Sequence, residues 1–252
     1  MSALELKEIY KIFGNEYGCI ALENINLLVE KGEFISVMGP SGSGKTTLIN
    51  IASTVIKKSS GKVIIDGLNI EKLNNEELAM MRREKVGFVF QDFRLIDSLN
   101  IEENIILPLV LKGLNHNKIY RKLKKIKEIL KLDYIISKKS IYELSGGEKQ
   151  RVAIARAIIH DPKILFADEP TGKLDTNSSN SIMDLFEKIN KNLNISIIIV
   201  THNPVSASYS DRVVFLKDGK IYNEIYKGEE KSSFYSRILD MVAFLGGKNY
   251  DL

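Results

Sequence analysis

The sequence predicts an α/β fold with a mainly parallel core sheet, an antiparallel β subdomain and a helical subdomain. An apolar run at residues 34–38 leads into a glycine-rich turn and then into a helical pattern. Residues 164–200 contain short apolar runs on either side of a helical pattern, the order of parallel strands joined by a crossover helix. We therefore expect a single domain over 1–252, with a helical subdomain at about 95–160 and a C-terminal tail at about 226–252.

The bulk composition is that of an ordinary globular protein. Of the 252 residues 44% are hydrophobic, and the net charge of +4 is too balanced to indicate a nucleic-acid partner, so none is expected. A single cysteine, Cys19, excludes an internal disulfide and indicates a reducing, cytosolic setting. The charged start of the chain is unlike a signal peptide, and apolar runs such as 195–200 are shorter than the roughly 20 residues of a membrane span. Any membrane role must come from a partner.

The elements before the core predict a small β layer. Apolar residues alternate over 4–12 and again over 22–29, which indicates antiparallel strands. Residues 62–66 form a further predicted strand that ends in a turn. Residues 86–90 predict a buried strand that ends at Gln91, so this amide is expected to reach a site at the end of the sheet.

The glycine-rich turn at residues 39–46 reads GPSGSGKT and predicts a phosphate-binding loop. A chance turn is the alternative, but the preceding strand and the following helix favour a phosphate site. Glycines let backbone N–H groups converge on phosphate oxygens, Lys45 is expected to bridge the β- and γ-phosphates, and the Thr46 hydroxyl to ligate Mg²⁺. The predicted nucleotide contacts of this loop are Gly39, Ser41, Gly42, Ser43, Gly44, Lys45, Thr46 and Thr47.

The middle of the chain predicts helices and a second anion site. A lysine-rich stretch at 118–131 could be a membrane-surface or nucleic-acid helix, but the solvated face of an amphipathic core helix is the favoured interpretation. Ser145, Gly146 and Gly147 precede a helix, where N–H groups and the helix dipole attract an anion; a capped helix is the alternative. One molecule cannot easily aim both sites at one nucleotide. A head-to-tail homodimer could place Ser145 against the γ-phosphate held by Lys45 of the other subunit.

Two acidic residues and one histidine follow predicted core strands. Asp168 and Glu169 follow the apolar run 164–167, at the sheet edge where open α/β folds bind ligands. A helix cap or turn is the alternative, but with the phosphate loop present we expect Asp168 to serve Mg²⁺ and Glu169 to act on the attacking water. His202 follows the run 195–200, where an imidazole can hydrogen-bond the γ-phosphate.

The remaining patterns complete the fold. Residues 213–222 predict a hairpin with a turn at 217–220, and the tail has apolar residues at helical spacing. His116 and His160 follow no core strand, and we expect them at the surface or as helix caps.

Taken in order, these motifs closely resemble the nucleotide-binding subunit of ATP-binding cassette (ABC) transporters. Residues 39–46 are similar to Walker A, Gln91 to the Q-loop, 144–148 to the signature motif, 164–169 to Walker B, 172–175 to the D-loop and His202 to the switch histidine. The resemblance implies a P-loop NTPase cassette fold, ATP and Mg²⁺ as cofactors, ATP hydrolysis and an integral-membrane permease as partner.

The resemblance also implies roles for individual residues. It places Glu169, His202, Lys45 and Gln91 in catalysis, and Thr46, Gln91 and Asp168 at the metal. To the nucleotide contacts it adds Phe13, Gln91, Ser145, Gly146, Gly147, Glu148, Asp168, Asp175 and His202.

Two positions depart from the family pattern. Phe13 stands where the adenine-stacking residue is usually Tyr, and Lys173 stands where the D-loop usually has a small or neutral residue.

A narrower resemblance concerns residues 159–162, 201–209 and 244–247, which are similar to the bacitracin-resistance (Bce-type) antimicrobial-peptide transporters. That family implies a ten-helix permease with a large extracellular domain, often coupled to a sensor histidine kinase. It places the chain at the cytoplasmic face of the cell membrane, held peripherally through the permease. The alternatives within the transporter class are lipoprotein-release, macrolide-export and cell-division complexes.

Two other function classes are weighed against a transporter. Soluble cassette proteins of translation have two cassettes in one chain, and those of DNA repair need long heptad coiled coils before the signature motif; neither feature is present. A non-catalytic nucleotide sensor would be favoured if Glu169 or His202 were replaced, and both are present.

Overall fold

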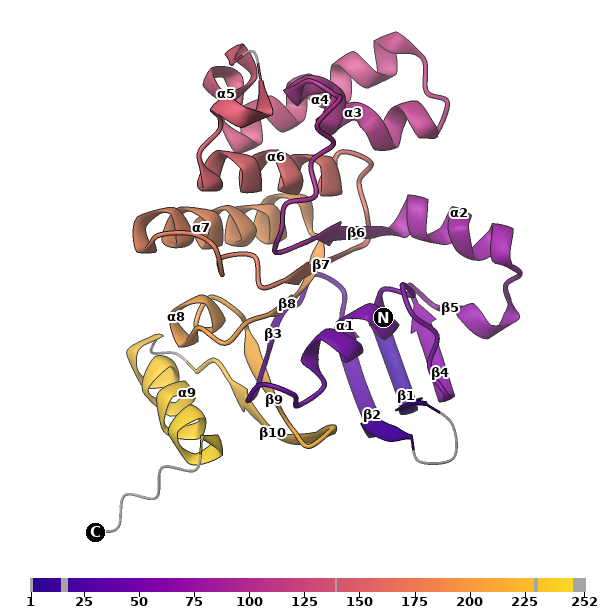
Figure 1. Cartoon of the computed structure of the whole chain (residues 1–252), viewed down its shortest axis with the longest axis vertical. Helices are drawn as coiled ribbons and strands as arrows, with labels where there is room; N and C mark the ends of the chain where they lie inside the picture. Colours follow the sequence, from indigo (N-terminus) through magenta and orange to yellow (C-terminus); the bar gives the residue numbers. More distant parts are fainter. Residues whose placement is uncertain (1, 15–17, 139, 229–230, 247–252) are drawn as a thin grey trace.

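The computed structural model describes residues 2–14, 18–138, 140–228 and 231–246. In this part of the chain the strands form two sheets, with the orders β2-β1-β4-β5 and β10-β9-β3-β8-β7-β6. Figure 1 shows α3 to α6 gathered at one end of the molecule, with α9 at the opposite end and the smaller sheet to one side. Within the described ranges no helix combines the length and the apolar character that crossing a bilayer requires.

The smaller sheet is antiparallel, as predicted. Its strands are β1 (Ser2–Phe13), β2 (Cys19–Glu30), β4 (Ser60–Ile65) and β5 (Leu68–Asn69). Leu6 of β1 pairs with Leu27 of β2 on one side and with Val63 of β4 on the other, and all three side chains are buried. The alternating sequence pattern therefore gives the sheet one face that packs against the core.

The core sheet is parallel apart from its last strand. Its strands are β3 (Phe34–Met38), β6 (Val86–Val89), β7 (Ile164–Asp168), β8 (Ser196–Val200), β9 (Arg212–Lys217) and β10 (Lys220–Tyr226). Strand β8 pairs in parallel with β3 and β7, whereas β9 and β10 form the predicted antiparallel hairpin. Every residue of β3 and β8 is buried, because helices cover both faces of a parallel sheet.

The helices pack around the core sheet, and α3 to α6 fall at residues 101–158. They are α1 (Lys45–Ala52), α2 (Asn75–Lys85), α3 (Ile101–Leu111), α4 (His116–Leu130), α5 (Asp133–Ser137), α6 (Gly146–Ile158), α7 (Thr176–Leu193), α8 (Pro204–Ala207) and α9 (Lys231–Leu245), with short 3-10 turns at Ile70–Lys72 and Ile141–Glu143. Helix α4 buries Leu123, Ile126 and Leu130 and turns most of its lysines outward, as the favoured interpretation predicts. Residues 247–252 of the predicted tail lie outside the described residues.

The two histidines without a predicted role differ in their surroundings. His116 is exposed at the start of α4, as expected. The surface or capping role expected for His160 is wrong, because its half-buried ring places Nε2 3.2 Å from the carbonyl oxygen of Val86. Burial lowers the pKa of His160 because the charged form loses hydration.

One buried arginine joins the two sheets. Arg212, on β9, is only 5% exposed, and its Nε donates to Oε1 of Glu33 at 2.6 Å. Its Nη atoms donate to a Glu224 carboxylate oxygen on β10 and to the carbonyl oxygen of Leu28 on β2. Burial acts against the charged form, but the two carboxylates prevail and raise the pKa of Arg212. The guanidinium thus connects β2, β9 and β10.

Replacing Arg212 tests this connection. We expect Arg212→Met to lower the free energy of unfolding by about 2–3 kcal/mol, because it leaves two half-buried carboxylates without their cation. Chemical denaturation of both proteins measures the difference. Lys191→Met, which removes the exposed pair with Glu187 on α7, is the matched control and should change stability by less than about 0.5 kcal/mol. Equal losses in the two variants would contradict the role assigned to Arg212.

Candidate nucleotide-binding site

The glycine-rich loop after β3 packs too closely on neighbouring strands for larger residues. Gly39 has φ 154°, and a Cβ there would lie 2.1 Å from the carbonyl oxygen of Leu216. Gly44 has φ 100°, and its Cβ would lie 2.5 Å from the carbonyl oxygen of Ala21. Glycine is therefore required at both positions by backbone conformation and by space. The loop is fixed between β9 and β2, and α1 begins directly after Gly44.

Lys45 folds back over this loop. Its Nζ donates to the carbonyl oxygens of Gly39 and Pro40, each at 2.8 Å. Burial lowers the pKa of Lys45, and the negative charges of Glu169 and Asp168 oppose this shift. The ammonium group therefore lies within the field of both acidic residues, at the position where a phosphate-bridging cation is expected.

The acidic pair lies where β7 ends. Asp168 is the last residue of β7, in register with Val200 of β8, and Glu169 follows with φ 46°. This left-handed conformation is unfavourable for a non-glycine residue, and the N–H of Glu169 donates to the carbonyl oxygen of Val200 at 2.9 Å. Burial and the neighbouring Glu169 raise the pKa of Asp168, while Lys45 and Arg94 oppose the shift. Strained backbone and a shifted carboxyl are typical of functional sites.

His202 faces Glu169 from the end of the neighbouring strand. Its Nδ1 lies 3.0 Å from Oε1 and 2.9 Å from Oε2 of Glu169. The loop of His202 leads directly into α8, whose first N–H groups are capped by the side chain of Asn203. The imidazole is largely exposed, so its free edge remains available to a ligand.

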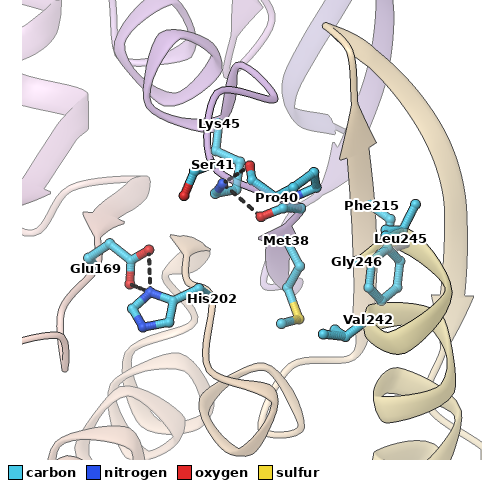
Figure 2. Close-up of a pocket in the computed structure, with 11 residues that line it drawn as sticks. Met38, Pro40, Ser41, Lys45, Glu169, His202, Phe215, Val242, Leu245 and Gly246 are labelled. Carbon is cyan, nitrogen blue, oxygen red and sulfur yellow. Dashed lines mark hydrogen bonds and ion pairs between the residues drawn. The ribbon is translucent and has the colours of Figure 1, made fainter. Parts of the chain in front are cut away.

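Lys45, Glu169 and His202 open into one cavity of about 340 Å³, which Asp168 does not line. Figure 2 shows Lys45 bonded back to its loop, while Glu169 and His202 face each other on the other side. The lining residues are Met38, Gly39, Pro40, Ser41, Lys45, Glu169, His202, Phe215, Val242, Leu245 and Gly246. The last three belong to the C-terminal end of the chain, and their place in this cavity was not predicted from the sequence.

The donor set at the sheet edge suits a hard divalent cation. Oδ1 of Asp168 is buried without a hydrogen-bond partner in the described part of the chain, and so is the hydroxyl of Ser43 in the loop. Thr46, Gln91 and Asp168 together offer hydroxyl, amide and carboxylate oxygens, the ligand types that Mg²⁺ prefers. The residues present therefore fit the predicted metal.

The D-loop region connects two other predicted elements within the same molecule. A Cβ on Gly172 would lie 3.0 Å from Nε2 of Gln91, so the two segments are in close contact. Lys173, which departs from the family pattern, forms an ion pair with Asp92 next to Gln91. Asp175 caps α7, and its hydrogen bonds with Ser178 lower its pKa.

The predicted second anion site lies at the N-terminus of α6. Ser145 and Glu148 form a capping box at α6, in which Oγ of Ser145 accepts from the N–H of Glu148 at 3.3 Å. The hydroxyl proton remains available for donation to a ligand. Burial on its own would raise the pKa of Glu148. The Lys138 ammonium at 2.7 Å and the hydrogen bonds with Ser145 outweigh burial and lower this pKa. None of Ser145, Gly146 and Gly147 is among the residues that line the cavity.

One predicted nucleotide contact lies apart from the cavity. Phe13 is 46% exposed at the end of β1, with Nζ of Lys11 4.6 Å from its ring centroid, and does not line the cavity.

Asn104, which sequence reasoning missed, is fully buried and holds the loop after Gln91 through hydrogen bonds to the backbone of Ile96, Leu99 and Asn100. In the sequence, Asn104 stands among the apolar residues that form the buried face of α3, and a polar residue at such a position is the signal that could have predicted its role.

Comparisons with known proteins identify the family. The family model described as ABC transporter matches residues 22–172. The ATP-binding protein YxdL of Bacillus subtilis is 47% identical, covering 99% of this chain and 96% of YxdL. The bacitracin export ATP-binding protein BceA of Halalkalibacterium halodurans is 43% identical over the full length of both chains. The macrolide export ATP-binding/permease protein MacB of Campylobacter jejuni is 42% identical, covering 88% of this chain but 34% of MacB.

A solved structure confirms the predicted fold. The dimeric post-hydrolysis structure of the cassette MJ0796 of Methanocaldococcus jannaschii, bound to ADP and Pi, has a TM-score of 0.81 and 38% identity, covering 89% of this chain and 99% of that one. The family match at residues 22–172 includes the glycine-rich loop and the acidic pair described above. The chain therefore belongs to the ABC transporter family, as an ATP-binding subunit that hydrolyses ATP.

Proposed function

We propose that this chain hydrolyses MgATP between two copies of itself and thereby drives a membrane permease. The observation that best supports this mechanism is the pair of Glu169 and His202 at 3.0 Å, facing the Lys45 loop across one cavity. A carboxylate held by an imidazole next to a phosphate-binding loop is suited to orient and deprotonate an attacking water. Residues 1–252 act as one domain in this proposal.

Each predicted residue has a stated role. Backbone N–H groups of the loop and Lys45 bind the β- and γ-phosphates, while Thr46, Asp168 and Gln91 hold Mg²⁺. When bound, the metal neutralises phosphate charge. Glu169 takes the proton of the water, and His202 hydrogen-bonds the γ-phosphate. Phe13 stacks on the adenine ring.

The second copy completes the site. Ser145, Gly146 and Gly147 form an anion-binding helix start that does not line the cavity of their own chain. A head-to-tail homodimer brings them, with Glu148 and Asp175 next to them, toward the nucleotide of the partner. The dimeric structure of MJ0796, bound to ADP and Pi, supports a dimer of this chain.

The permease is proposed to dock on the surface that follows Gln91. Phe93 and Arg94 have left-handed backbones, and their carbonyl oxygens accept hydrogen bonds from Arg156 on α6. The same arginine thus joins the Q-loop to the helix that begins at the second anion site. Docking here holds the chain at the cytoplasmic face of the membrane.

The cargo class is proposed from the relatives. BceA is matched end to end, which favours protection from, or export of, bacitracin-like and lantibiotic-like peptides, with a sensor histidine kinase coupled through the permease. The alternative is a macrolide-export complex, which the similarity to MacB favours, or a lipoprotein-release or cell-division complex.

Replacing the proposed base tests the reaction. We expect Glu169→Gln to lower kcat by at least about 100-fold, because the amide cannot accept a proton. ATP binding should persist, and the variant should elute as an ATP-dependent dimer in size-exclusion chromatography. Phosphate release and elution volume are measured on the same preparation. Turnover at an ordinary rate in this variant would exclude Glu169 as the base.

Charging the proposed docking surface tests the permease and the cargo. Ile96 is 39% exposed in the loop held by Asn104, and Ile96→Arg should lower permease recovery on affinity purification by at least about tenfold. Cells that depend on the chain should lose bacitracin resistance, whereas ATPase activity of the purified chain stays unchanged.

Leu28→Arg is the matched control for Ile96→Arg, since Leu28 is 50% exposed on β2 of the smaller sheet. Normal permease recovery with both variants would contradict the docking surface. Lost permease recovery together with lost macrolide resistance and unchanged bacitracin resistance would instead favour the alternative cargo.

A further inference from the structure

The C-terminal helix α9 is built into the wall of the nucleotide cavity. It begins 59 residues after the end of the family match at residue 172. Figure 1 shows it beside α8 and the β9–β10 hairpin. Its inner face buries Phe234 and Ile238 completely, in one apolar cluster with Met38, Ala207 and Phe215. The helix is therefore anchored along its length.

The last turn of α9 lines the same cavity as the first residues of the glycine-rich loop. Val242, Leu245 and Gly246 line the same space as Lys45 and His202, and Figure 2 shows their side of the cavity next to Phe215. Leu245 is only 8% exposed, while Leu239, on another face of the same helix, is 40% exposed. The helix thus presents two leucines in contrasting environments.

The cluster under this turn supports both segments that bind the phosphate. Met38 directly precedes Gly39 of the loop, and Ala207 belongs to α8, which begins two residues after His202. Leu245 packs in the same cluster as Met38 and Ala207. Packed interiors transmit displacement, so a change at Leu245 shifts the loop and the His202 segment relative to each other.

The apolar wall also limits water at this end of the cavity. Val242 and Leu245 contribute hydrocarbon surface opposite the charged groups of Lys45 and Glu169. Apolar walls strengthen charge interactions within a site and reduce the number of competing water molecules. We expect a disturbed wall to slow hydrolysis more than it weakens ATP binding, because the reaction needs more exact placement of the reacting groups than binding does.

We propose that Leu245 and Val242 are positioning residues for ATP hydrolysis, which hold the Gly39–Ser41 corner and the His202 segment in register and shield the γ-phosphate end of the cavity. The inference rests on the proposed phosphate site. It assigns a role in the reaction to a C-terminal helix that lies outside the matched family region.

Three substitutions in the full-length chain test this role. Leu245→Asn should lower kcat about tenfold, because small displacements of reacting groups are costly, while the Kd of a fluorescent ATP analogue changes less than about twofold. Leu245→Met, which keeps apolar volume, should retain kcat within about twofold. Leu239→Asn is the matched control on the exposed face and should leave kcat unchanged.

The proposal is overturned if Leu245→Asn and Leu239→Asn have the same kcat, or if Leu245→Asn weakens ATP binding as much as it slows turnover. If Leu245→Asn does not fold, Val242→Thr provides the test, since it keeps the shape and adds one hydroxyl to the wall. Its kcat should fall by about threefold with unchanged affinity, and an unchanged kcat would overturn the proposal.

Failure of this inference is distinguishable from failure of the proposed site. Glu169→Gln is measured alongside the α9 variants. If Glu169→Gln abolishes turnover while the α9 variants behave like wild type, only the role of α9 fails. If Glu169→Gln is active, the site itself is wrong.

Discussion

The parallel pairing of β3, β8 and β7 is the constraint on which the site depends. Val37 of β3 and Asp168 of β7 both pair with Val200 of β8, so the three strands end at one level. The phosphate loop, Glu169 and His202 each follow one of these strand ends within one or two residues. Backbone hydrogen bonds of the sheet thus fix the distances between segments that are far apart in the sequence.

This geometry concentrates charge at one edge of the core sheet. Lys45 and Asp168 are both partly desolvated. Burial lowers the pKa of Lys45 and raises the pKa of Asp168, because it disfavours the charged form of each. Such groups are preorganised to interact with phosphate and cation charge, because little water competes for them. The helix start at Ser145 lies outside this cavity. The central claim is therefore that each chain supplies half of a pocket that a second copy completes.

Local patterns in the sequence predicted the elements of this fold well. Local patterns predicted the strand before Gly39, the antiparallel strands β1 and β2 and the β9–β10 hairpin, because each of these depends on residues close together in the sequence. Contacts between distant residues were not predicted. His160 bonds Val86 across 74 residues. The helical spacing of apolar residues in the tail predicted a helix but did not show that Leu245 lines the nucleotide cavity. The roles of the site residues remain predictions.

Mixing two inactive variants tests the shared pocket most directly. Lys45→Ala removes the phosphate contact from one half of each pocket, and Ser145→Arg obstructs the other half. A mixed dimer has one pocket with both changes and one pocket with neither. The account predicts that mixing restores ATPase activity toward about a quarter of the wild-type rate, since half of the dimers are mixed and each keeps one intact pocket. Activity that stays at the sum of the two separate variants, although mixed dimers form, would contradict it.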